Sequence, residues 1–498
     1  MYEPLFIGID IGTQGTKGLL CRSDGSSVCE AFCPSKLIRP DANTVYENPE
    51  DILGSVLTVI FELTDRAGEA SRGIKALSID AQMAGIMGID KGFSPVTPLD
   101  SWLDTRCAGY TRLLREKAGD EAVKYSGGQF IHSHASKILW WKNEEPEAYS
   151  RIHKFIQPNA YVSGVLCGLD ADSAFMDYTF LHFNMFSDNS GCTFNTAMLS
   201  DFGVDKDKMP EIVSPEKKIG TVTSYFAEKC GLPDGVTVIA GSGDTAASSL
   251  GAGITRTGLA YDVAGTASVF ACCTDKFVPD TVYNTLMFSR SICDGLFLPL
   301  SYITGGGICL EWFSGIAGKS LRTLDAEAEN LPSSGDLFFI PHFGGRTFPI
   351  DDRMSGAFLG LGADTSKTAM HRAVMESVAF EYKRYYDILK KSGCILGEPE
   401  VIGVGGGAKS RIFAQTKADI LGITYAVPEK TESAASAMAL LAAHAAGFRT
   451  EPLHEIFKPD ITARKYLPDA SKTAYYASKA KKYLLLADGY GDYISGIC

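Results

Sequence analysis

The residues of this sequence that could do chemistry gather in glycine-rich turns next to short apolar runs. In the first such segment, Gly8–Lys17, Asp10 lies at the end of an apolar run, and Gly12 and Thr13 form the turn. Bare backbone N–H groups in this kind of turn can bind phosphate oxygens, and a carboxylate can hold a hydrated Mg²⁺. Lys17 adds a positive charge. The segment is neither a Walker A loop nor a G-x-G-x-x-G fingerprint, and the alternative is a hairpin in which Asp10 only forms the turn.

A second carboxylate directly follows a glycine-rich strand end in Gly241–Thr245. Asp244 at this position can approach a ligand closely and accept the proton of a hydroxyl that receives a phosphoryl group. It could equally cap the small-residue helix that we predict over 246–253. The spacing alone leaves both interpretations open.

Two further segments have the composition of binding sites. Trp102, Asp104 and Arg106 alternate along the chain, and an aromatic face with polar partners suits a sugar. The alternative is a surface turn with a local Asp–Arg pair. Gly405–Ser410 stands between a predicted strand and a predicted helix, which is a phosphate-binding geometry. The alternative there is a tight turn without a ligand.

The elements that would position these turns follow from hydrophobic periodicity and turn residues. We predict strands over 5–21 (broken by the turn), 74–79, 236–240, 259–263, 269–273 and 401–404, and helices over 49–67, 111–124, 135–145, 246–253, 366–391 and 411–421. Gly12-Thr13 and Gly265-Thr266 occupy matching strand–turn–strand settings about half a chain apart. This match indicates two related α/β domains, although Gly-Thr is common enough to recur by coincidence.

Composition narrows the class of protein. A chain of 498 residues suggests two to four domains, and its net charge of −12 disfavours nucleic acid or an anionic membrane as partner. The thirteen cysteines form no C-x-x-C pair or zinc pattern, so we expect reduced thiols and a cytoplasmic protein. No apolar run is long enough for a membrane span, and the Ala-rich stretch 434–448 is predicted to be a buried helix.

Taken in order, these segments resemble the motifs of the FGGY carbohydrate kinases, within the actin–hexokinase–Hsp70 ATPase superfamily. The resemblance runs nearly end to end. The segments that carry it are Ile7–Leu20, Ala81–Gly85, Trp102–Arg106, Ser136–Trp140 with Asn143–Pro146, Met176–Thr179, Gly241–Gly253, Val263–Phe270, and Val404–Ser410 with Gln415 and Ala418-Asp419.

The resemblance implies an α/β fold of two ribonuclease-H-like (actin-like ATPase) domains with a central interdomain cleft. Residues 1–250 would form the N-terminal domain on the sugar-binding side, and residues 251–498 the C-terminal domain on the ATP-binding side. The partners would be a small-molecule sugar and ATP with Mg²⁺, and dimers are common in the family, so a homodimer is an option.

The resemblance also assigns roles to individual residues. Asp244 would be the catalytic base, and Asp10 would lie near Mg²⁺ and the transferring phosphate. Substrate-binding positions would be Gln82, Met83, Ala84, Trp102, Asp104, Arg106 and Thr245. ATP-binding positions would be Gly12, Thr13, Gln14, Lys17, Gly265, Thr266, Gly306, Gly405, Gly406, Gly407, Ala408 and Ser410.

The acceptor is less defined, because several positions depart from the pattern of the xylulokinases that the chain resembles most. Ala84 stands where those proteins usually have a histidine that contacts the sugar, and losing a hydrogen-bonding partner can change selectivity by orders of magnitude. Leu103, Thr105, the Asn43–Pro49 segment and Glu376-Ser377 differ as well. A ketopentose such as D-xylulose is the first candidate. Another ketose, a polyol or a sugar acid is the alternative, followed by a non-catalytic sensor on the same fold; glycerol is disfavoured.

Overall fold

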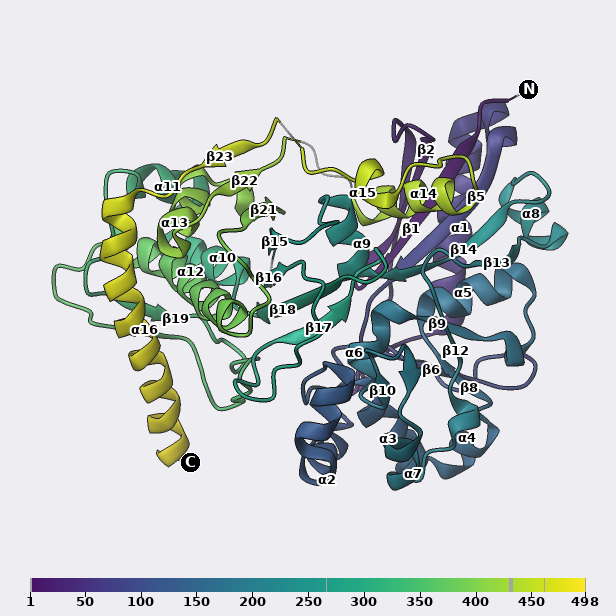
Figure 1. The fold of residues 1–498 in the computed structure, drawn as a ribbon, viewed down its shortest axis with the longest axis horizontal. Coiled ribbons are helices and arrows are strands. Elements are labelled where there is room, and N and C mark those ends of the chain that lie inside the picture. Colours follow the sequence, from purple (N-terminus) through teal and green to yellow (C-terminus); the bar gives the residue numbers. More distant parts are fainter. Residues whose placement is uncertain (1, 266, 430–432, 461, 498) are drawn as a thin grey trace. The chain divides into compact units, whose positions relative to one another are not determined.

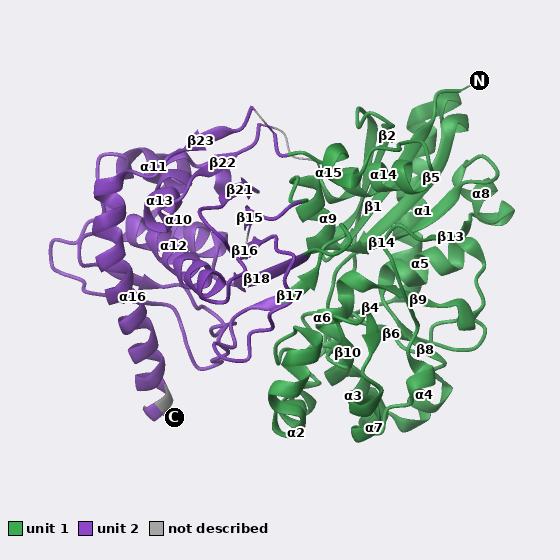
Figure 2. Cartoon of the chain, in the orientation of Figure 1, with its two compact units in different colours: residues 1–255, 288–296, 432–458 green, residues 256–287, 297–431, 459–498 purple. Residues whose placement is uncertain are grey.

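The computed structural model describes residues 2–265, 267–429, 433–460 and 462–497, and it has a mixed α/β fold (Figure 1). The chain forms two compact units (Figure 2). The first comprises residues 1–255, 288–296 and 432–458, and the second comprises residues 256–287, 297–431 and 459–498. The first crossing between the units lies close to the predicted boundary at residue 250, but two later segments also belong to the first unit.

The first unit is built on a six-stranded sheet with the order β13-β14-β5-β1-β2-β3. Its strands are β1 (Leu5–Gly12), β2 (Gly15–Arg22), β3 (Ser27–Pro34), β5 (Ile74–Ala81), β13 (Lys218–Thr221) and β14 (Thr237–Gly243). The meander β1-β2-β3 is antiparallel, whereas β5 runs parallel to both β1 and β14. The central strands are apolar along almost their whole length because helices cover both faces.

Alternation along β1 divides its residues between the two faces. Ile7 and Ile9 pack in the cluster that contains α1 (Pro49–Ala67), and Phe6 packs with Ala439 of α14 (Ala434–Ala445). Gly8 lies under α14, where a Cβ atom would come within 1.7 Å of the Ala435 carbonyl oxygen. The Ala-rich helix predicted over 434–448 is present as α14 and belongs to the first unit. The glycine at position 8 allows the helix backbone to approach β1 this closely.

The second unit repeats the topology of the first. Its strands follow the order β18-β16-β15-β21-β22-β23, with β15-β16-β18 antiparallel and β15, β21 and β22 parallel. They are β15 (Leu259–Ala264), β16 (Ser268–Cys272), β18 (Phe297–Ile303), β21 (Glu400–Val404), β22 (Tyr425–Val427) and β23 (Arg464–Tyr466). The shared order of meander plus parallel strands confirms the predicted pair of ribonuclease-H-like domains.

Buried ionic contacts join the helices of the second unit to its sheet and to each other. Asp262 of β15 accepts from Lys417 of α13 (Arg411–Leu421) at 2.5 Å and from Tyr382 of α12 (Lys367–Lys391) at 2.6 Å. The last helix, α16 (Ala470–Ile497), is held on α12 by Lys479 and Glu376 at 2.6 Å. Charges that are fully buried need such partners, so these contacts specify how the helices pack.

The remaining elements are short or peripheral. In the first unit they are β4 (Tyr46–Glu47), β6 (Met87–Ile89), β7 (Leu99–Asp100), α2 (Ala108–Ser126), α3 (His134–Glu144), α4 (Pro146–Arg151), β8 (Lys154–Ile156), α5 (Pro158–Cys167), β9 (Phe175–Asp177), α6 (Leu181–Asn184), β10 (Ser187–Asp188), β11 (Thr193–Phe194), α7 (Thr196–Asp201), β12 (Glu211–Val213), α8 (Ser224–Cys230), α9 (Asp244–Gly251) and α15 (Leu453–Ile456). In the second they are α10 (Gly307–Ala317), α11 (Leu321–Ala328), β19 (Phe338–Ile340) and β20 (Ala357–Leu359), and β17 (Met287–Arg290) crosses the boundary between the units. None of the helices in the described part of the chain combines the length and apolar character that crossing a membrane requires.

Candidate active site

Three aspartates meet at the carboxyl ends of the parallel strands in the first unit. Asp10 of β1 is in register with Asp80 of β5, and Asp80 is in register with Ser242 of β14. Asp244 follows Ser242 by two residues and is the first residue of α9. The charges of Asp10 and Asp244 both act on the Asp80 carboxyl, so the three carboxyl groups lie close together at this sheet edge. This is the edge at which open α/β sheets bind their ligands.

Asp80 is the member of this group that the sequence analysis did not select. Its side chain is fully buried, and in its ionised form no described residue donates a hydrogen bond to it. Burial first, and then the charges of Asp10 and Asp244, raise the pKa of Asp80 well above its usual range. In its protonated form Asp80 can donate to Asp10. The signal in the sequence was present: Asp80 follows an apolar strand and an isoleucine, as Asp10 does.

Asp244 differs from Asp80 because it is only partly buried. Burial first, and the charge of Asp10 second, raise the pKa of Asp244 to about 7. Its carboxylate accepts from the Thr245 hydroxyl at 3.2 Å. The N-cap position of α9 is Gly243, so Asp244 does not serve as the helix cap that its spacing also allowed. A carboxylate with a pKa near neutrality is suited to act as a general base at physiological pH.

The first glycine turn lies beside these carboxylates. Gly12 pairs with Gly15 across the hairpin, and Asp10 pairs with Lys17, whose charge opposes the rise that burial causes in the pKa of Asp10. Thr13 and Gln14 form the tip, with Gln14 exposed. A Cβ atom at Gly15 would lie 2.6 Å from the Cys33 carbonyl oxygen, a backbone atom, so the tight packing of the hairpin requires glycine there.

Beyond β5, the predicted sugar-side residues Gln82, Met83 and Ala84 are all buried. The Gln82 amide donates from Nε2 to Glu47 at 2.6 Å, while its Oε1 atom has no described hydrogen-bond partner. Lys137 of α3 donates from Nζ to the Ala84 carbonyl at 2.6 Å and to the Ser101 carbonyl at 2.9 Å. A single buried lysine thereby holds the two loops that carry the predicted sugar-binding residues.

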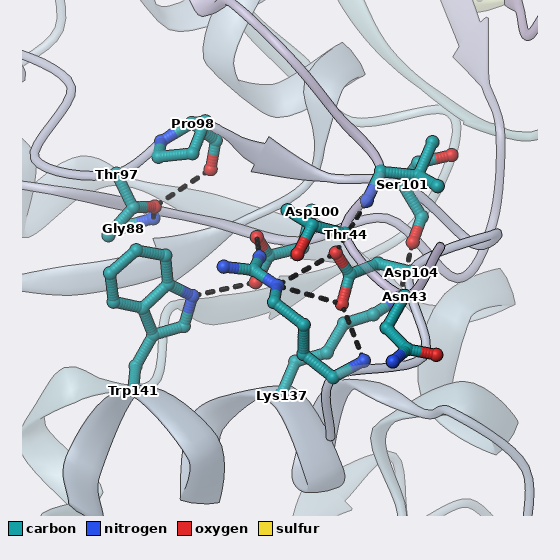
Figure 3. Close-up of polar contacts among 12 residues, drawn as sticks. Asn43, Thr44, Gly88, Thr97, Pro98, Asp100, Ser101, Asp104, Lys137 and Trp141 are labelled. Carbon is teal, nitrogen blue, oxygen red and sulfur yellow. Dashed lines mark hydrogen bonds and ion pairs between the residues drawn. The ribbon is translucent and has the colours of Figure 1, made fainter. Parts of the chain in front are cut away.

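Asp104 belongs to a network of polar contacts that also contains Asp100 and Trp141 (Figure 3). Asp104 accepts from the Val45 backbone N–H at 2.8 Å and from Arg106 Nε at 2.9 Å. Arg106 also contacts Asp100 at 2.6 Å, and the Trp141 indole N–H donates to the same carboxylate at 2.6 Å. The Asp–Arg pair exists as the sequence suggested. Asp104 is buried and Arg106 is partly buried, and their contacts with the protein fix the segment that contains Trp102.

In the second unit, the structure brings two predicted ATP-binding segments together. Gly405 has φ +87°, and a Cβ atom there would lie 2.8 Å from the Ala264 carbonyl oxygen. Gly265 follows Ala264, and its carbonyl accepts from the Gly307 N–H at 2.9 Å, beside Gly306. A Cβ atom at Gly407 would lie 3.0 Å from the Ala264 Cβ, whereas Gly406 has open space around its Cα. Thr266 lies outside the described residues.

The end of this glycine segment leads into α13. Ala408 is buried, and Ser410 is the N-cap of α13 and donates to Asp325 at 2.7 Å. Farther along α13, Gln415 donates to Asp419 and to the Leu467 carbonyl, both at 2.8 Å. These last two contacts were missed by the sequence analysis: the glutamine and aspartate of the quoted signature hold the chain that leads into α16.

The donor set at the sheet edge fits Mg²⁺. No group of three or more His, Cys, Asp or Glu side chains is arranged to hold a metal ion in the parts of the chain that the structure describes. Phosphate-bound Mg²⁺ does not need such a cage, because it uses one or two carboxylates, water and the phosphates themselves. Asp10, partly exposed at the sheet edge, can supply that carboxylate.

Comparisons with known proteins find matching family domains, related sequences and similar structures. Residues 5–251 match the FGGY family of carbohydrate kinases, N-terminal domain, and residues 289–446 match the C-terminal domain of the same family. A Bacillus subtilis (strain 168) protein named xylulose kinase is 26% identical over 493 residues, covering 97% of this chain and 95% of its own length. A protein named gluconokinase from the same organism is 26% identical, covering 89% of this chain and 87% of its own. A crystal structure described as a xyloylose kinase from Brucella ovis superposes with a TM-score of 0.90 at 26% identity, covering 97% of this chain and 99% of that one.

Proposed function

Because this chain belongs to the FGGY family of carbohydrate kinases, we propose that it transfers a phosphoryl group from ATP to a hydroxyl of a ketopentose, with D-xylulose as the first candidate. The observation that carries the proposal is the position of Asp244, a partly buried carboxylate with a pKa of about 7 beside Asp10 at a ligand-binding sheet edge. The substrate class is supported by the relatives named xylulose kinase that match nearly the whole chain.

Within this proposal, Asp244 accepts the proton of the attacking hydroxyl, and Thr245 positions the carboxylate through its hydroxyl. Asp10 would hold Mg²⁺, which would neutralise charge on the phosphates during transfer. Gln82, Met83, Ala84 and Trp102 form the sugar-binding surface. Asp104 and Arg106 serve the same surface by holding the Trp102 segment.

ATP is bound through glycine-rich backbone in both units. In the first unit we assign Gly12, Thr13, Gln14 and Lys17 to the phosphates. In the second unit we assign Gly265, Thr266, Gly306, Gly405, Gly406, Gly407, Ala408 and Ser410 to the nucleotide. We propose that the first compact unit mainly binds the sugar and the second mainly binds ATP. Their bounds differ from 1–250 and 251–498 because residues 288–296 and 432–458 belong to the first unit.

A sugar acid is the second candidate acceptor, because a relative named gluconokinase matches 89% of the chain. The Oε1 atom of the buried Gln82 has no hydrogen-bond partner among the described residues, and a substrate hydroxyl can donate to it. We further propose that the enzyme works in the cytoplasm, which is supported by the finding that none of the twelve described cysteines forms a disulfide. A homodimer is the first assembly to test.

The rate should depend on pH through Asp244. The base acts only when ionised, and burial together with the Asp10 charge raises its pKa to about 7. We therefore expect kcat/KM to fall about tenfold per pH unit below pH 7 and to level off above it. Initial rates at saturating Mg-ATP between pH 5.5 and 9 measure this profile. A profile that stays flat down to pH 5.5 would contradict the assignment of Asp244 as a base with a raised pKa.

A panel of acceptors tests the proposed activity. The purified protein is mixed with Mg-ATP and one compound at a time from ketopentoses, ketohexoses, polyols, sugar acids and glycerol, and ADP release is measured. We expect the highest kcat/KM with a ketopentose. A maximum with gluconate would transfer the assignment to sugar acids, and a protein that consumes no ATP with any compound would refute the proposal.

A further inference from the structure

A single hydrogen bond joins the sugar-side segment to the phosphate-side turn of the first unit. The indole Nε1–H of Trp102 donates to the Thr13 hydroxyl at 2.8 Å. Trp102 follows β7, whereas Thr13 is at the tip of the β1–β2 hairpin. Our proposed function gives these two residues different ligands, so the hydrogen bond lies between the acceptor and the phosphate donor.

Both ends of this hydrogen bond are firmly held. The backbone on either side of Trp102 is fixed, because Ser101 donates from its N–H to the Val45 carbonyl and accepts from Lys137. On the other side, Asp104 accepts from the Val45 N–H. The carbonyl of Thr13 accepts from the Ser35 hydroxyl at 2.5 Å. The Trp102 side chain is nonetheless 42% exposed, so its ring can contact a ligand while its N–H stays engaged.

The donor and acceptor properties of the Trp102 indole and the Thr13 hydroxyl determine where the hydroxyl proton of Thr13 can point. An indole N–H is a donor only, and a hydroxyl has one proton and two acceptor lone pairs. Because the Thr13 oxygen already accepts from Trp102, its own proton is free to be donated to another group. A hydroxyl fixed in this way suits an anionic acceptor such as a phosphate oxygen, and charge-assisted hydrogen bonds are stronger than neutral ones.

We propose that Trp102 is a positioning residue for phosphoryl transfer, and that its indole N–H orients the Thr13 hydroxyl toward a phosphate oxygen. A sugar that packs on the same ring immobilises the indole and thereby strengthens the hold on the phosphate. Acceptor and nucleotide therefore bind cooperatively, and each raises the affinity for the other by the same factor. This inference rests on the proposed function, which supplies the two ligands.

Trp102→Phe tests the inference because it keeps an aromatic ring and removes the N–H donor, together with part of the ring area. We expect the Kd for the sugar in the absence of nucleotide to change by less than about threefold, whereas kcat/KM for ATP falls about tenfold, as the loss of one hydrogen bond to a charged group would give. Thr13→Val should show a similar loss, and Thr13→Ser should retain most of the activity because it keeps the hydroxyl. Trp312→Phe is the matched control, since Trp312 is 39% exposed and lies in the second unit; its kinetics should equal those of the wild type.

The double variant Trp102→Phe/Thr13→Val decides whether the two groups act together. If Trp102 acts through Thr13, the double variant is no slower than Thr13→Val alone. Losses that multiply, a Trp102→Phe enzyme with unchanged kcat/KM for ATP, or a defect confined to KM for the sugar would each overturn the inference. Melting curves of every variant identify a protein that has failed to fold, and Thr13→Ser then carries the comparison.

Binding measurements separate this inference from the proposed function. Titration calorimetry of Mg-ATP into the wild type and the two single variants, without sugar, measures the contribution of the Thr13 hydroxyl directly. Suppose that the wild type consumes no ATP with any panel sugar, but that both variants bind Mg-ATP more weakly than the wild type and to the same extent as each other. The proposed function then fails and the link between Trp102 and Thr13 stands. If the wild type is active and the variants bind Mg-ATP as it does, only the link fails.

Discussion

Asp244→Asn is expected to lower kcat by about 10³-fold while the protein still binds its sugar, because general-base catalysis of this kind contributes about 10²–10⁴-fold. Asparagine has nearly the shape of aspartate but cannot accept the hydroxyl proton. Asp80→Asn is the matched comparison in the same group of carboxyls. Burial raises the pKa of Asp80 and so favours its protonated, uncharged form; an amide there should therefore reduce kcat by less than about tenfold.

Stopped-assay measurements of kcat, together with calorimetric titration of the sugar, check both variants. An Asp244→Asn enzyme that turns over at a near-normal rate would remove Asp244 from the role of base. Equal losses in the two variants would mean that the clustered carboxyl groups act together and that Asp80 takes a direct part in the reaction. Loss of sugar binding in Asp244→Asn would show that the carboxylate mainly holds the acceptor.

The same variant provides a check on folding. A carboxyl whose pKa is raised in the folded state binds its proton more tightly there than in the unfolded chain, so its contribution to stability is lost as pH rises from about 4 through 7. Asp244→Asn avoids that loss. At pH 8 we expect the variant to be more stable than the wild type, by on the order of 1–3 kcal/mol. An inactive variant that is also more stable cannot be inactive through misfolding.

Gly8→Ala is expected to destabilise the protein by at least about 3 kcal/mol, the upper part of the range for overpacked cores. The added Cβ atom would lie 1.7 Å from the Ala435 carbonyl oxygen and 2.5 Å from the Ala439 nitrogen. Both are backbone atoms of α14, so no side-chain rotation relieves the clash, and the whole helix must move away from β1. Thermal and urea unfolding followed by circular dichroism measure the loss.

Gly54→Ala is the control for the same substitution. Gly54 lies within α1, and nothing comes within 4 Å of a Cβ atom placed there. Alanine in a helix interior is more favourable than glycine by about 0.5–1 kcal/mol, so this variant should be slightly more stable than the wild type. Equal melting temperatures for Gly8→Ala and the wild type would contradict the packing of α14 on β1.

Local patterns predicted most elements because each depends on a few neighbouring residues. The buried strands of both sheets are apolar runs, and α1 and α12 have helical periodicity, so their positions follow from the sequence. The matching Gly-Thr turns also indicated the duplication that the two sheets display. The order of the motifs along the chain produced the resemblance to the family, and the family matches confirm that resemblance.

The features that could not be predicted from the sequence are those that depend on contacts between distant segments of the chain. Asp80 becomes a member of the carboxyl group only through the register of β5 with β1 and β14. The partners of Arg106 include Asp100, which lies on a different short strand, and no spacing rule identifies it. Position along the chain assigned 434–445 to the second half, whereas its packing on Gly8 assigns α14 to the first unit.

The place of α14 in the chain has a consequence for how the protein is made. When a ribosome has synthesised residues 1–255, the strands β1, β5 and β14 exist, but the face that carries Phe6, Ala76 and Ile239 has no cover. Its cover is encoded some 180 residues later, after most of the second unit. The first unit begins to be synthesised first, but it cannot complete its fold until α14 has been made. Until then its apolar sheet face is exposed, and chaperones can recognise such a face. For the same reason, we expect a fragment that stops at residue 255 to be unable to fold on its own.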